Sequence, residues 1–146
     1  MNWADVIPES RILCGAHCET KRDAIGLLSD LLARDLALDS TTLHKAIAAR
    51  EKLGPTTIGS GVLLPHTASE LVERPTGALL LLDKPLKCPS PDDVAVDICI
   101  GILMPQDGKG IPLLAKLIQP LRKDDTLREL REAETPAAAL AALQAS

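Results

Sequence analysis

The 146-residue chain carries a formal net charge of −4, and Trp3 is its only aromatic residue. This length suits one domain, predicted over residues 1–146, that buries an aliphatic core without disulfide or metal support. Nucleic-acid binding usually requires a basic face and stacking aromatic side chains, and the composition supplies neither. No apolar run approaches the roughly 20 residues of a membrane span, and no charged-then-apolar leader opens the chain. We therefore expect a cytoplasmic protein that neither binds nucleic acid nor inserts into a membrane.

A short apolar stretch at residues 12–13 predicts a weak strand. The segment that follows it is the first whose side chains could bind a metal ion. It contains Cys14 and Cys18 with a histidine between them, and thiolates and imidazole suit zinc. The cluster has no matching second pair, however, because Cys88 and Cys99 lie far away in a different pattern. In a reducing compartment such cysteines behave as small buried hydrophobes. We therefore expect neither a metal site nor a disulfide.

Two helices are predicted between residues 21 and 53. Thr20 caps the first, Asp23 follows three residues on, and leucines repeat at helical spacing as far as Leu36. The second begins after the Asp-Ser pair at 39–40, which contains two natural N-cap residues.

Arg50 falls on the apolar stripe that Leu43 and Ile47 form on the second helix, since residues three and four apart share a helix face. A guanidinium on a buried face is costly unless it meets an anion or several acceptors. Two interpretations are open. Arg50 receives a negatively charged group near His66, or it pairs with a carboxylate such as Asp97 or extends to solvent from the helix end.

A turn punctuated by glycines leads from this helix into a short apolar run, Val62 to Leu64, which stops at Pro65. Proline donates no backbone hydrogen bond, so a strand should end there and leave His66 at the margin of the sheet. Imidazole acts as a nucleophile near neutral pH. We predict that His66 is accessible to a partner and that residues 67–74 form a loop or a short turn.

Two continuously apolar segments, Thr76 to Leu82 and Val94 to Met104, predict central strands, because strands covered on both faces lack alternation. The proline-containing stretch 83–93 is predicted to connect them at the surface. Three further helices are predicted: residues 113–121, 125–132 and 135–143. Strands interleaved with helices indicate an α/β domain layered helix–sheet–helix, with a mixed sheet of about four or five strands.

Nine residues in one segment carry a more specific signal: Arg50, Glu51, Gly54, Thr56, Ile58, Gly59, Gly61, Pro65 and His66. Together they resemble the signature of the phosphotransferase-system IIA domains of the fructose/mannitol type, nearest the nitrogen-regulatory branch. The likeness extends over nearly the whole chain, including Ile7-Pro8, Val96-Asp97 and the Leu-Met-Pro sequence at 103–105.

The resemblance implies a single α/β domain in which His66 accepts a phosphoryl group from a histidine-containing phosphocarrier protein. In the sugar-transport branch the group passes to a IIB domain and then to sugar. In the regulatory branch, phosphorylation controls binding to regulatory targets, including sensor kinases and potassium transporters. Because no transmembrane or IIB segment accompanies the chain, a stand-alone regulatory phosphocarrier is favoured, a phosphotransferase component and not a free-standing catalyst.

Two alternatives stand beside this interpretation. One is a IIA-like binding module that transfers phosphate poorly, and the other is a stand-alone sugar-transport IIA component. Association of the domain into a homodimer is left open by the sequence.

Phosphoryl transfer between proteins requires an exposed nitrogen, in-line geometry and donors that stabilise the equatorial oxygens. Arg50 can supply a planar set of donors, and the hydroxyl of Thr56 or the backbone amides of the Gly59–Gly61 turn can supply neutral ones. The glycine-rich segments 59–61 and 108–110 match neither a P-loop nor a dinucleotide fingerprint. No motif requires a magnesium, nucleotide or other cofactor.

Many members of the family carry a second histidine, in a His-Leu-x-x-Leu pattern, where the loop after the central strands enters the next helix. Here the corresponding stretch reads Ile-Pro-Leu-Leu at 111–114 or nearby, and no histidine follows His66. Loss of a preorganised donor typically costs about 2.7–4 kcal/mol of transition-state stabilisation. We hypothesise that Gly108, Lys109 and Gly110 compensate, through backbone amides and a cation beside a helix N-terminus.

Overall fold

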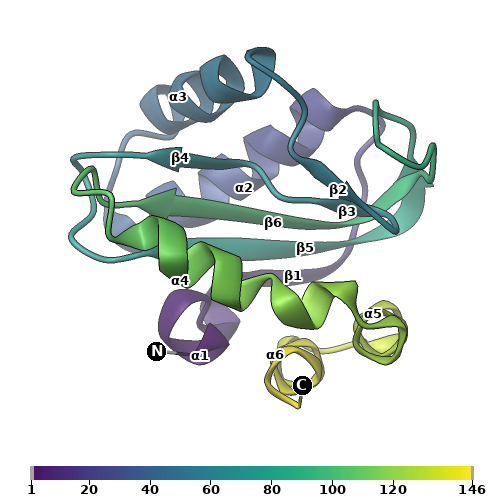
Figure 1. Cartoon of the computed structure of the whole chain (residues 1–146). Helices are drawn as coiled ribbons and strands as arrows, with labels where there is room; N and C mark the ends of the chain where they lie inside the picture. Colours follow the sequence, from purple (N-terminus) through teal and green to yellow (C-terminus); the bar gives the residue numbers. More distant parts are fainter. Residues whose placement is uncertain (1, 146) are drawn as a thin grey trace.

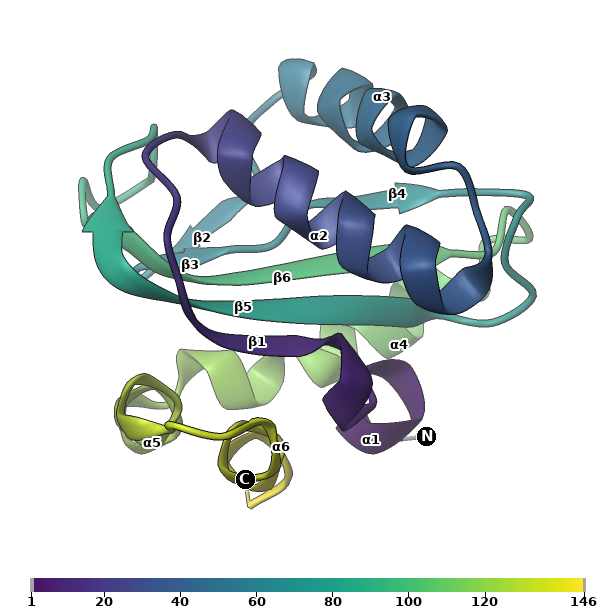
Figure 2. The same ribbon diagram turned by 180° about the vertical axis from the view of Figure 1, so that it is seen from behind.

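A mixed sheet forms the middle layer of the computed structural model, which describes residues 2–145 (Figures 1 and 2). Its strands are β1 (Ile12–Ala16), β2 (Thr57–Gly59), β3 (Val62–Leu63), β4 (His66–Ala68), β5 (Thr76–Leu86) and β6 (Val96–Met104). The strand order is β1-β5-β6-β3-β2, and β4 also pairs with β6. The helix–sheet–helix arrangement and the mixed sheet are confirmed, but the prediction of four or five strands is wrong because β2 and β4 contain no apolar run that marks them as strands.

The two long apolar strands form the centre of the sheet. β5 and β6 are antiparallel, whereas β1 runs parallel to β5, and β3 and β4 run parallel to β6. β5 continues to Leu86, so the surface connection predicted from residue 83 begins later than expected. Thr76 and Leu103 are partners in this pairing, which places the end of β6 beside the start of β5.

Pro65 interrupts the outer edge without ending it. Val62 and Leu63 pair with β6, the ladder breaks at Leu64 and Pro65, and pairing resumes at His66 opposite Ile102. The offset between partners is the same on both sides of the break, because the Pro65 carbonyl still accepts a 2.9 Å hydrogen bond from the Ile102 amide. The predicted strand end at Pro65 and the loop from residue 67 are therefore wrong for residues 66–68, although His66 does lie on the edge strand.

Two helices, α2 (Lys21–Leu36) and α3 (Ser40–Lys52), cover one face and the β4 edge of the sheet (Figures 1 and 2). Thr20 and Asp23 form the capping box that the sequence predicts at the start of α2. Asp39 caps α3 by accepting a 3.0 Å hydrogen bond from the Thr42 amide. The bounds predicted for α2 are confirmed, and those for α3 agree to within one residue.

The other face carries the remaining helices: α1 (Trp3–Val6), α4 (Gly110–Leu117), α5 (Asp124–Glu132) and α6 (Pro136–Gln144). Short 3₁₀ turns, η1 (Glu9–Arg11) and η2 (Gln119–Arg122), join these helices to their neighbours. The single helix predicted over 113–121 is wrong at its end, because Pro120 has no N–H to continue the α-helical pattern. Within residues 2–145, no helix has the length and apolar character that crossing a bilayer requires.

The core is divided by the sheet into two apolar clusters, and alternate residues of β6 separate them. Ile98, Ile100 and Ile102 face α4, α5 and α6, whereas Cys99 and Leu103 face α2 and α3. Side chains of paired residues in neighbouring strands point to the same face of a sheet. His66, as the partner of Ile102, therefore belongs to the face that carries α4.

Candidate phosphoryl-acceptor site at His66

His66 lies at the first position of β4, half-buried on the edge of the sheet. Its Nδ1 atom is 2.8 Å from the Leu64 carbonyl oxygen, two residues earlier in the chain. A carbonyl oxygen only accepts hydrogen bonds, so Nδ1 carries the proton in this contact. Nε2 then holds the lone pair. The local geometry thus fixes the tautomer in which Nε2 is free to form a bond.

The Leu64 carbonyl is itself held in place by a chain of hydrogen bonds. The Leu64 amide donates to the Thr56 carbonyl at 3.0 Å. Thr56 in turn donates twice to Glu51, from its amide to Oε1 at 2.9 Å and from its hydroxyl to Oε2 at 2.6 Å. Lys21 of α2 completes the chain with a 3.0 Å ion pair to Glu51 Oε1. His66 is therefore oriented through four residues: Leu64 directly after β3, Thr56 directly before β2, Glu51 of α3 and Lys21 of α2.

Glu51 is the buried centre of this chain, with 7% of its surface exposed. Burial alone would raise the pKa of its carboxyl. The hydrogen bonds from the Thr56 hydroxyl and amide, together with Lys21, outweigh that effect and hold the pKa below its usual value. Glu51 is therefore ionised at neutral pH, and removal of either partner would leave a buried charge short of donors.

Sequence reasoning included Glu51 in the family signature but gave it no role, although a signal for its contact with Thr56 was present. Leu43 and Ile47 are buried on α3, and the next residue at a spacing of four is Glu51. The stripe was instead continued to Arg50, which is only half-buried. Glu51 ends the apolar stripe of α3, and Thr56 follows the helix shortly after. A buried carboxylate needs donors, so this pattern could have identified the contact between Glu51 and Thr56.

Arg50 does not form the ion pair with Asp97 that one interpretation allowed. Its Nη1 atom donates to the Gly54 carbonyl at 3.3 Å, beyond the end of α3. Asp97 is instead held by Arg131, whose Nε atom lies 2.9 Å from Oδ2. The remaining guanidinium N–H groups of Arg50 have no hydrogen-bond partner within residues 2–145. Those groups are available to an anion from outside.

The Thr56 hydroxyl is already engaged as a donor. Its hydrogen bond to Glu51 directs it into the protein, and Thr56 is 6% exposed. In this arrangement the threonine supports Leu64 through its carbonyl and does not present its hydroxyl to a ligand.

The turn at Gly59–Gly61 is not brought together with His66. Val62 pairs with Ile98 and His66 with Ile102, so four residues of strand, about 13 Å, separate the turn from the imidazole. The Ser60 amide donates to Asp92 at 2.7 Å, so that donor is occupied. The turn therefore has a structural role, at the end of the sheet away from His66.

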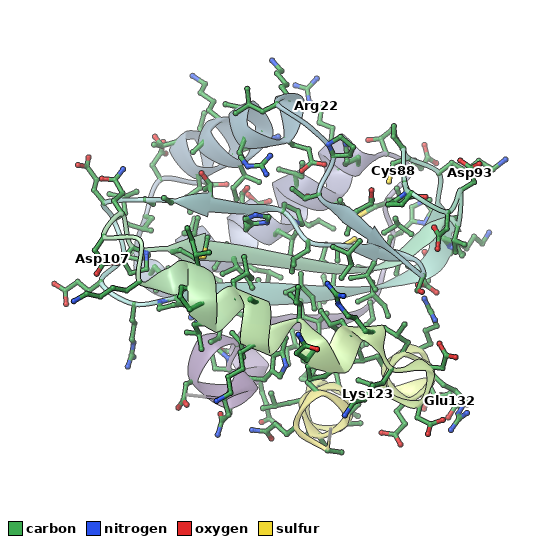
Figure 3. All side chains as sticks on the ribbon, viewed as in Figure 1. Arg22, Cys88, Asp93, Asp107, Lys123 and Glu132 are labelled. Carbon is green, nitrogen blue, oxygen red and sulfur yellow. The ribbon has the colours of Figure 1, made fainter. Side chains whose placement is uncertain are left out.

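The segment 108–110 does lie at the same end of the sheet as His66. Asp107, in the loop before α4, and Asp93, in the loop before β6, are at opposite ends of the sheet (Figure 3). Gly110 begins α4 and is buried against Met104, the residue of β6 two positions beyond the partner of His66. Lys109 is exposed, and its amide donates to Asp107 at 2.9 Å.

The remaining candidate residues lie apart from His66. His17 is exposed and contacts Asp83 at 3.1 Å. His44 is half-buried on α3. All four cysteines are free, and Cys18 and Cys99 are buried as expected of small hydrophobes. Among residues 2–145, no group of three or more His, Cys, Asp or Glu side chains is arranged to hold a metal ion.

Comparison with known proteins defines the family. The model of the phosphoenolpyruvate-dependent sugar phosphotransferase system, EIIA 2, family matches residues 5–146, so the chain belongs to that family of IIA domains. It is 33% identical over 122 residues to a nitrogen regulatory protein of Klebsiella oxytoca, covering 82% of this chain and 75% of the relative. The resemblance that the sequence indicated, including the nitrogen-regulatory branch, is confirmed.

Solved structures agree with this assignment. The nitrogen regulatory protein IIA-Ntr of Neisseria meningitidis superposes with a TM-score of 0.88 at 27% identity, over 96% of this chain and 97% of that one. The mannitol IIA domain of Escherichia coli, solved in complex with phosphorylated IIB, superposes with a TM-score of 0.79 at 19% identity, over 94% of this chain and 96% of that one. The second likeness concerns the fold alone.

Proposed function

We propose that this protein is a regulatory phosphocarrier that accepts a phosphoryl group on Nε2 of His66 from a histidine-containing phosphocarrier protein. The observation that carries the proposal is the 2.8 Å contact between Nδ1 and the Leu64 carbonyl, because it leaves the lone pair on Nε2 of a half-buried edge residue. Membership of the IIA family supports the same role.

In the proposed step, the Nε2 lone pair of His66 attacks the phosphorus of the donor's phosphohistidine. The new P–N bond forms as the donor's P–N bond breaks, and the electron pair returns to the donor imidazole. Nδ1 keeps its proton throughout. The imidazole of His66 gains positive charge as the bond forms, and the hydrogen bond to the Leu64 carbonyl stabilises it. Glu51 and Thr56 are positioning residues, since they act on His66 only through Leu64.

The phosphoryl oxygens need donors that the edge of the sheet can supply. Arg50 has unused guanidinium N–H groups, and Gly110 and Lys109 lie at the N-terminus of α4, at the same end of the sheet as His66. A helix N-terminus favours negative charge. We assign phosphate binding to these three residues and a structural role to Gly59 and Gly61.

Phosphorylation adds a compact dianion at an edge strand, which changes the surface that a partner meets. As the resemblance to the nitrogen-regulatory branch implies, the phosphorylation state would control binding to regulatory proteins in the cytoplasm, such as a sensor kinase or a potassium transporter. No step in this proposal requires a metal or a cofactor.

The test is phosphorylation in a reconstituted system. Incubation with phosphoenolpyruvate, enzyme I and the histidine phosphocarrier should yield one acid-labile, base-stable phosphate by mass spectrometry. His66→Ala should remove the signal. His17→Gln is the matched control, because it changes an exposed histidine away from the site and should leave labelling intact. Labelling that persists in His66→Ala would contradict the proposal.

One observation favours a second candidate, a binding module with weak transfer: no histidine stands in the loop before α4 or anywhere after His66. Under that alternative, the purified protein would bind its partners unchanged, and no donor would label it. A stand-alone sugar-transport IIA component would instead pass its label to a IIB domain.

A further inference from the structure

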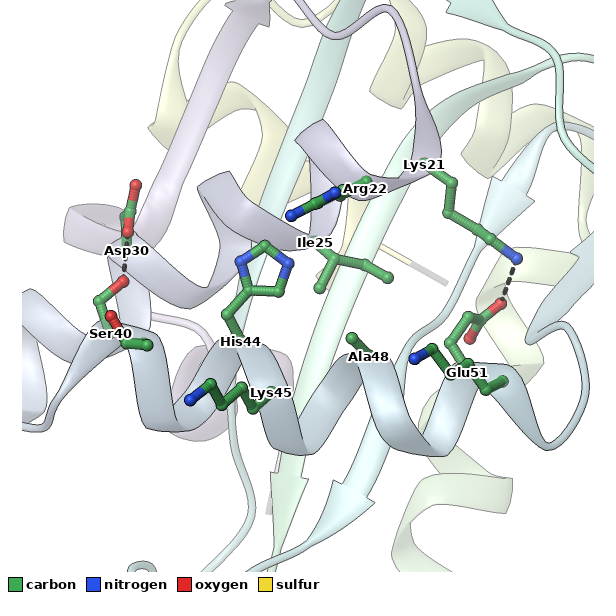
Figure 4. Close-up of a pocket in the computed structure, with 11 residues that line it drawn as sticks. Lys21, Arg22, Ile25, Asp30, Ser40, His44, Lys45, Ala48 and Glu51 are labelled. Carbon is green, nitrogen blue, oxygen red and sulfur yellow. Dashed lines mark hydrogen bonds and ion pairs between the residues drawn. The ribbon is translucent and has the colours of Figure 1, made fainter.

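A cleft of about 780 Å³ lies between α2 and α3, and His66 does not line it (Figure 4). Its floor contains Ile25 and Ala48, and two internal contacts close its ends: Ser40 donates to Asp30 at one end, and Lys21 pairs with Glu51 at the other. The volume falls within the range of about 300–1,000 Å³ that is usual for small-molecule sites.

The acidic groups of the cleft already have partners, whereas among its basic groups only Lys21 forms an ion pair within residues 2–145. Asp30 accepts from Ser40, and Glu51 is bound by Lys21 and Thr56. Within residues 2–145, Arg22 and the ring of His44 have neither a hydrogen-bond nor an ion-pair partner. Lys45 and Lys52, which also line the cleft, add two more cations. The cleft is therefore locally positive in a chain whose net charge is −4.

The positions of Arg22 and His44 point to one shared ligand. Arg22 extends from α2 and His44 from α3, and the two side chains point toward one another across the cleft (Figure 4). The ring of His44 packs against α2 at Gly26, where a Cβ atom would lie 3.5 Å from His44 Cε1, an ordinary van der Waals distance. The imidazole rests against the α2 backbone at this point, so its direction is set by packing. Two donors that face each other with no acceptor between them suit a group with several anionic oxygens.

We propose that this cleft binds a small phosphomonoester, with the phosphate between Arg22 and His44 and the organic part over Ile25 and Ala48. Lys45 adds a cation on the rim. The guanidinium binds phosphate oxygens in a bidentate manner, and the imidazole donates from its free edge. The apolar floor favours an ester over free phosphate, because it offers surface to a carbon skeleton.

The test is ¹H–¹⁵N NMR titration of the whole chain with glucose 6-phosphate, inorganic phosphate and glucose at constant ionic strength. The sugar phosphate should cause saturable shifts at residues 21–26 and 44–48, with a Kd at or below about 1 mM. Inorganic phosphate should bind the same residues more weakly, and glucose should leave them unchanged. Equal shifts from glucose, or shifts that never saturate, would overturn the proposal.

Variants distinguish binding in the cleft from nonspecific attraction to surface charge. Arg22→Gln and His44→Gln should each weaken binding of glucose 6-phosphate about tenfold, as expected for loss of one charge-assisted hydrogen bond. Arg122→Gln removes an exposed cation from η2, on the opposite face of the sheet, and should leave the Kd unchanged. Equal weakening by Arg122→Gln, or no effect of the two cleft variants, would contradict the site. His66→Ala should still bind, so this result is independent of the proposed function.

Discussion

Glu51 accepts two hydrogen bonds from Thr56, one from the amide at 2.9 Å and one from the hydroxyl at 2.6 Å. This pair fixes the chain between the end of α3 and the start of the edge strand. Because the Thr56 carbonyl holds the Leu64 amide, and the Leu64 carbonyl holds His66 Nδ1, a contact remote from the imidazole determines its orientation.

The Thr56→Val variant should lower both the stability of the protein and the rate at which His66 is phosphorylated. It leaves Glu51 ionised and buried with one donor fewer, at a cost of about 1–3 kcal/mol in the free energy of unfolding. Urea unfolding measures the first effect, and the initial rate of labelling measures the second. Thr56→Ser should restore both, because it keeps the hydroxyl. Thr41→Val, at an exposed position of α3, should change neither. Full activity in a destabilised Thr56→Val protein would refute the positioning role.

Glu51 should also make stability depend on pH. The pKa of Glu51 in the folded state is lower than its ordinary value of 4.5. At pH values between these two pKa values, the unfolded state therefore binds more protons than the folded state. The stabilisation by Glu51 is therefore complete above about pH 4.5 and is lost as the pH falls through the folded-state value. Glu51→Gln should unfold more easily than wild type at neutral pH, and that difference should shrink in acid. Urea unfolding of both proteins at about pH 7 and pH 4 measures it, and a difference that stays constant would contradict the prediction.

The sequence predicted the parts of this site that depend on local pattern. Proline at 65 and apolar residues at 62–64 placed His66 on an edge, and the capping residues gave α2 its bounds. The contact between Glu51 and Thr56 was not predicted, because it depends on how the chain turns after α3 and not on helix periodicity. β4 was missed for a related reason: its pairing with β6 is non-local, and residues 66–68 lack any apolar run.

The position of the Gly59–Gly61 turn likewise required the three-dimensional register. The sequence places the turn five residues before His66, which suggests proximity. An extended chain separates such residues by roughly 16 Å. The glycines are needed instead for packing: Gly61 has φ +81°, and Asp97 and Arg131 lie against it.

Gly61→Ala should therefore destabilise the protein more than Gly15→Ala. Both glycines have positive φ, +81° and +73°, so an alanine at either position costs about 1–2 kcal/mol in backbone strain. A Cβ atom at Gly61 would lie 2.7 Å from Arg131 Nη2 and 3.0 Å from the Ala95 carbonyl oxygen, whereas at Gly15 nothing lies within 4 Å. We expect a further loss of about 1–3 kcal/mol for Gly61→Ala. Chemical unfolding of both variants measures the difference, and equal losses would show that the turn relaxes without cost.

Lys109→Ala should slow phosphorylation of His66 about tenfold, because a cation beside the N-terminus of α4 would no longer stabilise the transferred group. Lys109 is exposed, so its contribution is screened by salt, and the gap between variant and wild type should narrow as ionic strength rises. Lys116→Ala is the matched control, since it removes an exposed lysine from the last turn of the same helix. Initial rates of labelling at low and high salt measure both effects. Unchanged rates for Lys109→Ala would assign phosphate binding at this end of the sheet to Arg50 and the backbone of α4 alone.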